Sequence, residues 1–487
     1  MKKSQHSYMF KTAYILFLLV LVSCKSTTKK HHITSDEKQP NVLIILTDQL
    51  RAQSTSYAGD PNVNTPHLDN LEAISVNFKN AVSGMPVCTP FKASLITGQR
   101  PLTNGVFMND VQLDTNAVSM AKIYNKAGYD TGFIGKWHID GHGRESFIPP
   151  GNRRQGFQFW MANECTHNYN SSIYYDNNDP TPKTWNGYDT FEQTDAAIDY
   201  INSKKNVNNP FLLMLSWGTP HNPYDSAPKK YRDMFNPDDM ELRPNVPENI
   251  ATKVRKDIAG YYAHIVALDD MVGELIQDLK SNNQLDNTII VFTSDHGDLL
   301  GSQGAYRKQQ PFDESVRVPM LVHIPKYLGI KPGKREAILN SEDILPTLLS
   351  LCQINIPEPI EGINYKPYME GKDDTVGKET IITCVQPFGE WNKPKRQGRE
   401  YRGLVTEKYT YVKDLNGPWL LFNNEEDPHQ MNNLVNKTDY AVLQSDLDSR
   451  LTQRLKANGD QFLPGTHYLD KWGIKVDHLG TVPYKKH

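Results

Sequence analysis

The chain has 487 residues, enough for a large hydrophobic core and for more than one lobe. Its composition is that of an ordinary globular protein, without repeats or low-complexity tracts. The formal net charge is −3, and it becomes −6 without residues 1–24, which carry three lysines and no acid. A mildly acidic chain has no general electrostatic attraction for nucleic acid, so we expect no nucleic-acid partner. An anionic substrate would therefore need positive charge concentrated in one pocket.

The first forty residues have the pattern of an export signal followed by a tether. Three lysines precede an apolar run at residues 13–22, and this run is too short to cross a bilayer, which needs about 20 apolar residues. The run ends in Leu-Val-Ser-Cys, which resembles a bacterial lipobox and implies lipidation of Cys24. A plain cleaved signal is the alternative. We predict a lipoprotein-type signal peptide at 1–24 and a flexible tether at 25–40. The protein would then be exported, and either lipid-anchored to the bacterial cell envelope or periplasmic.

Residues 41–371 alternate between apolar runs and amphipathic patterns, and we predict that they form the catalytic domain. Short apolar runs are typical of strands buried on both faces, and they occur at residues 42–46, 131–134, 211–217, 288–292 and 320–324. Helical spacing occurs at 68–74 and 257–280, where apolar residues recur every three or four positions. Strands that alternate with helices predict an α/β fold with a large, mostly parallel sheet covered by helices on both faces.

Two regions depart from this alternation. Residues 143–208 are long for a connection and rich in Asn, Gly, Pro and aromatic residues, so we expect them to line a substrate cleft. Their aromatic side chains either stack on sugar rings or pack the loop: Trp160, Tyr169, Tyr174, Tyr175 and Trp185. Residues 403–412 alternate like an antiparallel strand pair. We predict a smaller C-terminal α+β subdomain with an antiparallel sheet at 372–487.

Polar side chains follow four of the predicted strands at the points where the strands end. The four endings are Thr47-Asp48-Gln49, Gly135-Lys136-Trp137-His138, Pro220-His221-Asn222-Pro223 and Ser294-Asp295-His296-Gly297-Asp298. In open α/β sheets, ligand sites form just beyond the carboxyl ends of the strands. One such ending would be unremarkable, but four together predict a single convergent site.

A cysteine precedes a predicted helix in residues 86–98, Pro-Val-Cys-Thr-Pro-Phe-Lys-Ala-Ser-Leu-Ile-Thr-Gly. Thr89 suits the helix N-cap and Pro90 the first helical position. The free amides of a helix N-terminus favour an anion beside Cys88, and Lys92 adds a full positive charge one turn on. Taken alone, this segment is more typical of a buried structural cysteine before a core helix.

The segment resembles the signature of the type I sulfatases of the alkaline phosphatase superfamily, Cys-X-Pro-X-Arg followed by a Leu-hydrophobic-Thr-Gly run. Cys88, Pro90 and residues 95–98 match, whereas Phe91 replaces a small residue and Lys92 replaces the arginine. Lysine keeps the charge but lacks the planar guanidinium fork. The resemblance implies that a formylglycine-generating maturation enzyme oxidises Cys88 to formylglycine, whose hydrate is the nucleophile. The two departures bear on how well that enzyme recognises Cys88.

The strand ends also carry the side chains that suit a hard divalent cation. The resemblance implies that Asp48-Gln49 and Asp295-His296 stand where sulfatases hold calcium with Asp-Asp and Asp-Asn pairs. This exchange removes one carboxylate and adds an imidazole, which makes the ligand set slightly softer. We expect one divalent cation at these four residues, calcium in preference to manganese or another transition ion. Asp298 lies close by in the sequence, and we expect it to cap the next turn.

Lysines and histidines in the same motifs supply the remaining predicted roles. Lys136, in a Gly-Lys-Trp-His element, and Lys308, which opens a Lys-Gln-Gln-Pro-Phe-Asp run, resemble the lysines that bind sulfate in the family. His138 and His221 are acid–base candidates because imidazole titrates near neutral pH. The resemblance implies that His138 assists the aldehyde hydrate, and that His221 contacts the sulfate and gives a proton to the departing alcohol. We also predict a catalytic role for Lys92.

These features predict a covalent hydrolysis of sulfate esters in two steps. One hydroxyl of the hydrated formylglycine attacks sulfur and expels the alcohol. The second hydroxyl then loses its proton, sulfate leaves and the aldehyde returns. We expect an exported sulfatase that acts on a sulfated polysaccharide or oligosaccharide. The alternatives are a phosphodiesterase or phosphonate monoester hydrolase of the same superfamily, and a catalytically inactive glycan-binding relative.

Overall fold

The computed structural model describes residues 39–484 except 394 and 397. The predicted signal peptide with Cys24, and residues 25–38 of the predicted tether, lie outside the described residues. Pro40 already belongs to the folded part, because it is buried and its carbonyl accepts a hydrogen bond from the Tyr129 hydroxyl (3.0 Å). In this part of the chain, no helix combines the length and the apolar character that a membrane crossing requires.

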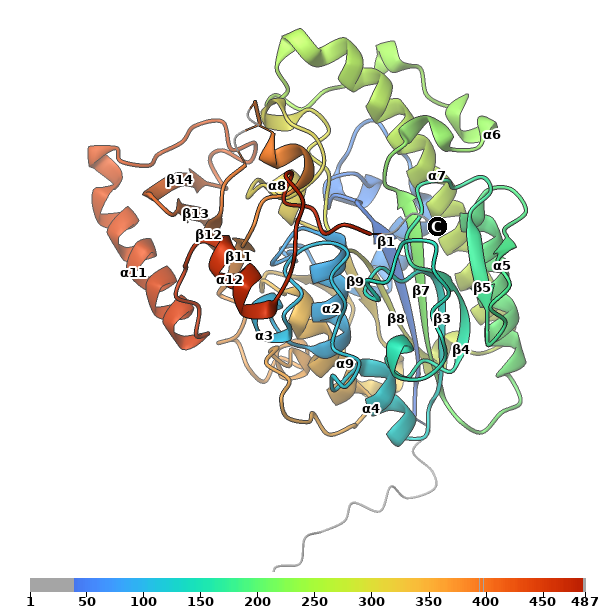
Figure 1. The fold of residues 1–487 in the computed structure, drawn as a ribbon. Helices are drawn as coiled ribbons and strands as arrows, with labels where there is room; N and C mark the ends of the chain where they lie inside the picture. Colours follow the sequence, from blue (N-terminus) through green and yellow to red (C-terminus); the bar gives the residue numbers. More distant parts are fainter. Residues whose placement is uncertain (1–38, 394, 397, 485–487) are drawn as a thin grey trace, which may run out of the picture. The chain divides into compact units, whose positions relative to one another are not determined.

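Ten strands form one large mixed sheet (Figure 1). They are β1 (Asn41–Asp48), β2 (Ser75–Phe78), β3 (Asp130–Lys136), β4 (Phe159–Asn163), β5 (Ile173–Asp176), β6 (Lys183–Thr184), β7 (Phe211–Pro220), β8 (Thr288–Ser294), β9 (Met320–His323) and β10 (Gly333–Arg335). Their order is β10-β2-β9-β8-β1-β7-β3-β4-β5-β6. The five central strands, β8, β1, β7, β3 and β4, run parallel to one another. At the two sides of this central part, β9 pairs antiparallel with β8 and β5 pairs antiparallel with β4. The predicted α/β sheet is thus confirmed, with antiparallel flanks that the apolar runs did not indicate.

Helices cover both faces of this sheet because the middle residues of the central strands β1, β7 and β8 are apolar on both faces. In β1, Val42 and Ile44 belong to one core cluster with side chains of α2, α4 and α9, whereas Leu43 and Ile45 belong to another with side chains of α1, α5 and α7. Each such buried aliphatic side chain contributes about 1.5–3 kcal/mol to folding. The helices are α1 (Pro66–Ala73), α2 (Cys88–Thr97), α3 (Pro101–Asn104), α4 (Met120–Lys126), α5 (Asp189–Ser203), α6 (Lys229–Arg232), α7 (Ala251–Ser281), α8 (Asp313–Val316), α9 (Ile344–Leu351), α10 (Lys366–Met369), α11 (Ala441–Ala457) and α12 (Gly465–Trp472).

A second, antiparallel sheet lies in the C-terminal part of the chain, as predicted. Its four consecutive strands are β11 (Glu379–Cys384), β12 (Tyr401–Thr406), β13 (Tyr409–Asp414) and β14 (Gly417–Asn423). Helix α11 covers one face, where Leu447 and Leu451 pack against Leu404 and Tyr411. Ile382 and neighbouring side chains on β11 and β12 form a separate cluster with residues of the larger part of the molecule.

The parallel register brings four strand ends to one edge of the large sheet. Asp48 at the end of β1 pairs with Pro220 on β7, directly before His221. On its other side, β1 pairs with β8. The last pair is Thr47 with Ser294, and these two residues directly precede Asp48 and Asp295. Lys136 is the last residue of β3, which also pairs with β7. The chemistry-bearing residues therefore meet because their strands run side by side and end together.

Candidate active site

Helix α2 places Cys88 at this edge, although the helix starts differently from our prediction. It begins at Cys88 with Val87 as the N-cap residue, so Thr89 and Pro90 lie inside its first turn. The predicted cap by Thr89 is wrong, because the Thr89 amide is itself satisfied by the side-chain oxygen of Asn109 (3.1 Å). The capping group comes from a loop twenty residues further on, which local sequence rules do not detect. Cys88 therefore lies directly at the positive end of the helix dipole.

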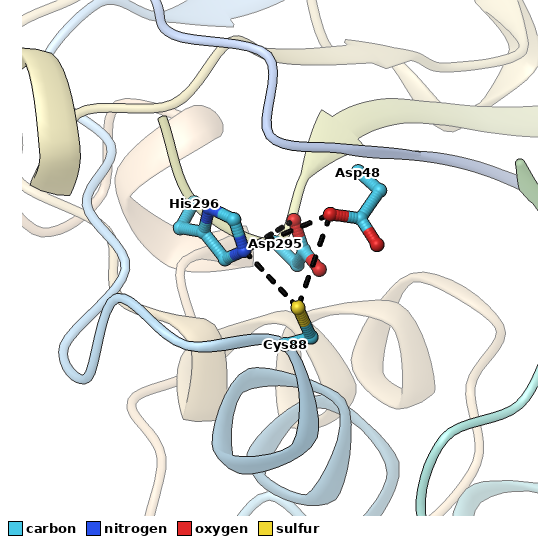
Figure 2. Close-up of side chains that lie close together, drawn as sticks. All are labelled: Asp48, Cys88, Asp295 and His296. Atoms are coloured by element: carbon cyan, nitrogen blue, oxygen red, sulfur yellow. Dashed lines mark hydrogen bonds and ion pairs between the residues drawn. The ribbon is translucent and has the colours of Figure 1, made fainter. Parts of the chain in front are cut away.

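Four side chains form a tight cluster around the end of β1 (Figure 2). Asp48, Cys88, Asp295 and His296 each offer a ligand atom, and these atoms all lie within 4.8 Å of one another. His296 donates its Nδ1 proton to the Gly297 carbonyl (2.9 Å), so in the neutral ring Nε2 keeps a lone pair. This Nε2 lies 3.3 Å from the Cys88 Sγ and 3.5 Å from the Asp295 Oδ1.

The cluster has the properties of a cation site. The Asp295 Oδ2 is buried and has no hydrogen-bond partner among the described residues. Burial and the neighbouring Asp48 carboxylate raise the pKa of Asp295 to about 7. A cation at this position would offset the repulsion between the two carboxylates and the cost of burying them. Two carboxylates and one unprotonated imidazole nitrogen form a donor set that fits a divalent metal ion.

Gln49 lies beside this cluster in a left-handed backbone conformation (φ 73°). Its backbone amide donates to the Asp295 Oδ1 (3.0 Å), and its side-chain nitrogen donates to Asp298 (2.7 Å). The second bond turns the Gln49 Oε1 toward the Lys308 ammonium (3.3 Å). Asp298 also accepts the Leu300 amide (3.0 Å), which is the turn cap that we predicted. Asp298 therefore caps the turn and also orients the side-chain amide of Gln49.

Two lysines bring positive charge to Cys88. Lys136 Nζ lies 2.5 Å from the Asp48 Oδ2, and Lys308 Nζ lies 3.1 Å from the Cys88 Sγ. Burial opposes the charge on Lys136, but Asp48 raises the pKa of Lys136 well above its usual value. Burial and Asp48 oppose ionisation of Cys88, but Lys308, Lys136 and His296 lower the pKa of the thiol well below its usual value. The surroundings of Cys88 therefore favour negative charge, as a site for an anionic ester requires.

Lys92 lies directly behind the backbone of Lys136. Its Nζ donates to the Lys136 carbonyl (2.7 Å) and to the Ser216 hydroxyl oxygen (3.0 Å), because one turn after Cys88 helix α2 faces β3 and β7. These strands approach so closely that a Cβ added at Gly135 would lie 2.2 Å from the Ser216 carbonyl oxygen. Through these bonds Lys92 supports the site, since it holds the backbone from which the Lys136 side chain extends. Its predicted catalytic role stays a prediction.

We expect Lys92→Met to destabilise the protein by about 1–3 kcal/mol, because it leaves the buried Lys136 carbonyl and Ser216 hydroxyl without their charged donor. Urea denaturation monitored by tryptophan fluorescence measures this loss. Lys126→Met, which removes an exposed lysine at the end of helix α4, is the control. A Lys92→Met variant as stable as the control would contradict the supporting role.

His138 is held by residues that the sequence did not single out. Its Nε2 lies 3.3 Å from the Asp110 Oδ1, and Arg144 binds both oxygens of Asp110 (2.9 and 2.8 Å). The ring of Tyr484 covers the Arg144 guanidinium at 4.4 Å. The His138 Nδ1 is buried without a hydrogen-bond partner among the described residues. Although burial opposes protonation, Cys165 and Asp110 raise the pKa of His138 well above its usual value. His138 is therefore a strengthened base with one free nitrogen.

We expect Asp110→Asn to lower kcat by about 10²-fold, because it removes the carboxylate that stabilises protonated His138. The pKa of His138 should fall, so the acidic limb of the pH–rate profile should move to lower pH. Steady-state kinetics between pH 5 and 9 with an aryl sulfate tests both effects. An unchanged profile with a reduced rate would show that Asp110 acts only on folding or maturation.

His221 directly follows β7, whose last residue pairs with Asp48. Its Nδ1 donates to the Asn222 carbonyl (2.8 Å), which leaves Nε2 as the free nitrogen of the neutral ring. His167 stacks on His221 with ring centroids 4.6 Å apart. Burial and the charge of Lys308 lower the pKa of His221 well below its usual value. An anionic ester bound beside it would raise this pKa again and favour protonation of Nε2.

The region expected to line a cleft contacts the site histidines and their partners, but not through most of the aromatic residues that drew attention to it. Three residues of this region lie at the site: Arg144 binds Asp110, Cys165 lies beside His138, and His167 stacks on His221. Trp160, in contrast, is fully buried in the core. Tyr174 stacks on Trp185 at 3.8 Å. None of the three site residues follows a predicted strand, so only the length of the region indicated them.

Comparisons with known proteins agree with this geometry. The sulfatase family model matches residues 40–354, and the model for the C-terminal part of N-sulphoglucosamine sulphohydrolase matches residues 301–457. The chain is 42% identical over 478 residues to an ulvan-active sulfatase of Formosa agariphila, covering 96% of this chain and 92% of that protein. It is 28% identical to an endo-4-O-sulfatase of Bacteroides thetaiotaomicron, covering 85% of this chain and 92% of that protein.

A solved structure, the Bacteroides fragilis sulfatase yidJ, superposes with a TM-score of 0.79 at 29% identity, covering 89% of this chain and 98% of that one. The family model alone covers more than half of the chain. The protein is a member of the sulfatase family, whose enzymes hydrolyse sulfuric esters.

Proposed function

We propose that this protein is an exported, formylglycine-dependent sulfatase that removes O-sulfate groups from a sulfated polysaccharide, ulvan or fragments of it. The observation that carries the proposal is the convergence of Cys88, the lysines Lys136 and Lys308, and the histidines His138 and His221 at one edge of the sheet. The substrate class is supported by the 42% identity to an ulvan-active sulfatase along almost the whole chain.

We propose calcium as the divalent cation of the cluster. Asp48 and Asp295 are hard oxygen donors, and His296 contributes the one nitrogen. Gln49 stays the proposed fourth ligand, although its Oε1 accepts a hydrogen bond from Lys308 in this structure. Conversion of Cys88 to formylglycine would replace the soft sulfur in the cluster by oxygen, which favours a hard ion. When bound, the cation would polarise the sulfate oxygens and offset the charge that develops on them.

In the first step, Lys136 and Lys308 bind the sulfate group of the ester, because their ammonium groups flank the position of the Cys88 side chain. One hydroxyl of the hydrated formylglycine at position 88 attacks sulfur and passes its proton to the Asp295 carboxylate, whose Oδ2 has no other partner among the described residues. The bond between sulfur and the ester oxygen breaks as the new oxygen–sulfur bond forms. His221, protonated at Nε2, donates a proton to the departing alcohol.

In the second step, His138 accepts the proton of the remaining hydroxyl at its free Nδ1, while Asp110 stabilises the resulting imidazolium. The carbon–oxygen bond to sulfate then breaks, sulfate leaves, and the aldehyde re-forms. Water rehydrates the aldehyde for the next cycle. A serine or an unmodified thiol at this position lacks the second hydroxyl and cannot complete this step.

The test is release of free sulfate by enzyme co-expressed with a formylglycine-generating enzyme. Ulvan, other sulfated polysaccharides, a phosphodiester and a phosphonate monoester are offered side by side. Sulfate release from ulvan is the expected result. Faster hydrolysis of the phosphorus esters would identify a phosphodiesterase or phosphonate monoester hydrolase, and no hydrolysis by a fully converted enzyme would identify a glycan-binding relative. Intact mass of the peptide containing Cys88 reports the conversion, on which Phe91 and Lys92 bear directly.

The proposed export rests on the sequence of the first 24 residues, with Cys24 as the site of lipid attachment to the bacterial cell envelope. Membrane fractionation of cells that express the full chain tests it. Wild type should sediment with membranes, and Cys24→Ala should not. A wild-type protein found only in the soluble periplasmic fraction would favour a plain cleaved signal.

A further inference from the structure

A groove opens beside the active site, next to two of its residues. Its lining starts at Asn222 and Pro223, which directly follow His221, and includes Arg307, which directly precedes Lys308. Helix α6, the first turns of α7 (Figure 1) and residues of the C-terminal part complete its walls. Its volume of about 820 Å³ lies near the upper end of the range for small-molecule sites. The groove therefore has room for more than the single sugar that carries the scissile ester.

The groove concentrates positive charge in an acidic protein. Its cationic side chains outnumber its acidic ones: Arg232, Lys253, Lys256, Arg307 and Arg396 against Asp225, Asp257 and Glu390. Only part of this charge is neutralised locally, since Lys253 pairs with Asp257 and Arg307 lies 3.9 Å from Glu390. This is the local concentration of positive charge that an anionic substrate requires in a chain with a net charge of −3.

Three of the groove cations have no local partner. Arg232, Lys256 and Arg396 are exposed, and none of them forms an ion pair with another residue in the described ranges. They come from α6, from α7 and from the C-terminal part, so the charge is spread along the groove and not gathered at one point. A row of separated cations suits a chain molecule with several anionic groups better than a single small anion.

The rest of the lining suits a sugar. Tyr224 and Tyr306 are half-buried, and Lys253 lies 4.2 Å from the centre of the Tyr306 ring. The Asn222 Oδ1 is buried without a hydrogen-bond partner among the described residues, so it can accept a hydrogen bond from a hydroxyl group. Aromatic faces beside polar acceptors match the apolar faces and hydroxyl groups of pyranose rings. The Tyr224 hydroxyl also donates to Asp298 (2.5 Å), which orients Gln49 in the catalytic cluster.

We propose that this groove is a binding subsite for the sugars on the leaving-group side of the scissile ester, and that its cations bind the sulfate or carboxylate groups of those sugars. The direction follows from the adjacency to His221, the proposed proton donor to the leaving group, so the inference rests on the proposed function. The enzyme then prefers oligomers and polymers to monosaccharides, because each further anionic sugar gains a cationic partner.

The test is a pair of charge reversals, Arg232→Glu with Lys256→Glu, in the matured full-length enzyme. The matched control is Lys280→Glu, an exposed lysine on the same helix as Lys256 and about 36 Å further along it. Substrates are ulvan oligosaccharides of increasing length and 4-nitrophenyl sulfate, whose leaving group is too small to enter the groove. Thermal melting confirms that all variants fold alike.

We expect the double variant to raise KM for the longer oligosaccharides by about tenfold, with kcat and the 4-nitrophenyl sulfate kinetics within about twofold of wild type. Added salt should raise the wild-type KM for oligosaccharides and affect the double variant less, because screening removes the same attraction. Unchanged oligosaccharide kinetics, or equal losses on both substrates, would overturn the subsite.

Failure of the proposed function has a different signature. If wild type releases no sulfate from any oligosaccharide, the proposed function fails. Binding of the same oligosaccharides by isothermal titration calorimetry then tests the groove separately. Binding that the double variant weakens about tenfold and Lys280→Glu leaves intact would support an anionic-glycan site, and binding that neither changes would overturn it.

Discussion

Cys88→Ala should abolish turnover, with a loss of about 10⁴-fold or more in kcat, because it removes the proposed precursor of the nucleophile. Cys88→Ser should behave differently from Cys88→Ala. Its hydroxyl can attack sulfur once, and the protein should then gain the mass of one SO₃ group and stop. Intact-mass spectrometry after incubation with 4-nitrophenyl sulfate measures this single turnover.

The control is Cys352→Ala, which removes another buried thiol far from the site, beside Tyr124 in the core. Its activity should stay within about twofold of wild type, with a modest loss of stability from the small cavity. Multiple turnovers by Cys88→Ser would contradict the need for a second hydroxyl. Persistent activity in Cys88→Ala would contradict the whole assignment of the nucleophile.

Asp295→Asn should remove metal binding and lower kcat/KM by about 10³-fold, because it deletes one of the two carboxylates that make the cluster suit a cation. The backbone amide of Gln49 can still donate to the remaining oxygen, so the local fold should survive. Metal content by mass spectrometry of the purified variant, and calcium titration by thermal shift, measure the loss. EDTA treatment should lower wild-type activity to a similar extent, and calcium should restore it only in wild type.

The same variant tests the electrostatics of the metal-free site. Without a cation, burial raises the pKa of Asp295 to about 7 from its ordinary 3.8, so the ionised carboxylate destabilises the folded state. This destabilisation is absent below pH 3.8, grows as the pH rises through that window, and is complete above pH 7. In EDTA, Asp295→Asn should therefore melt at a higher temperature than wild type at pH 8, and the difference should shrink at pH 5. A lower melting temperature for the variant than for wild type at pH 8 would contradict the predicted destabilisation of the folded state by the ionised Asp295 carboxylate.

The local sequence was sufficient to predict the site residues that directly follow strands of the large sheet. Asp48, Lys136, His221 and Asp295 each follow a buried apolar run, and parallel strands that lie side by side must end at a common edge. The predicted convergence is therefore confirmed for these strand ends. The expectation rested on the period of the apolar residues and on short motifs, both of which are local properties of the chain.

The supports of the site could not be predicted in this way. Asp110, Arg144 and Tyr484 lie in irregular segments, and they reach His138 only because the chain packs three distant segments together. Lys92 matched a catalytic position by motif, but its hydrogen bonds to Lys136 and Ser216 show a structural contact.

What the sequence alone determined is thus the central parallel strands, the residues at their ends and the place of Cys88 before a helix, since short-range patterns encode burial and strand direction. What only the tertiary structure decided is which further side chains contact those residues. These partners include the Asn109 cap of α2, the Asp110–Arg144 pair behind His138 and the charged groove beside His221. A side-chain contact between distant segments depends on the packing of the whole core, and no periodicity in the chain records it.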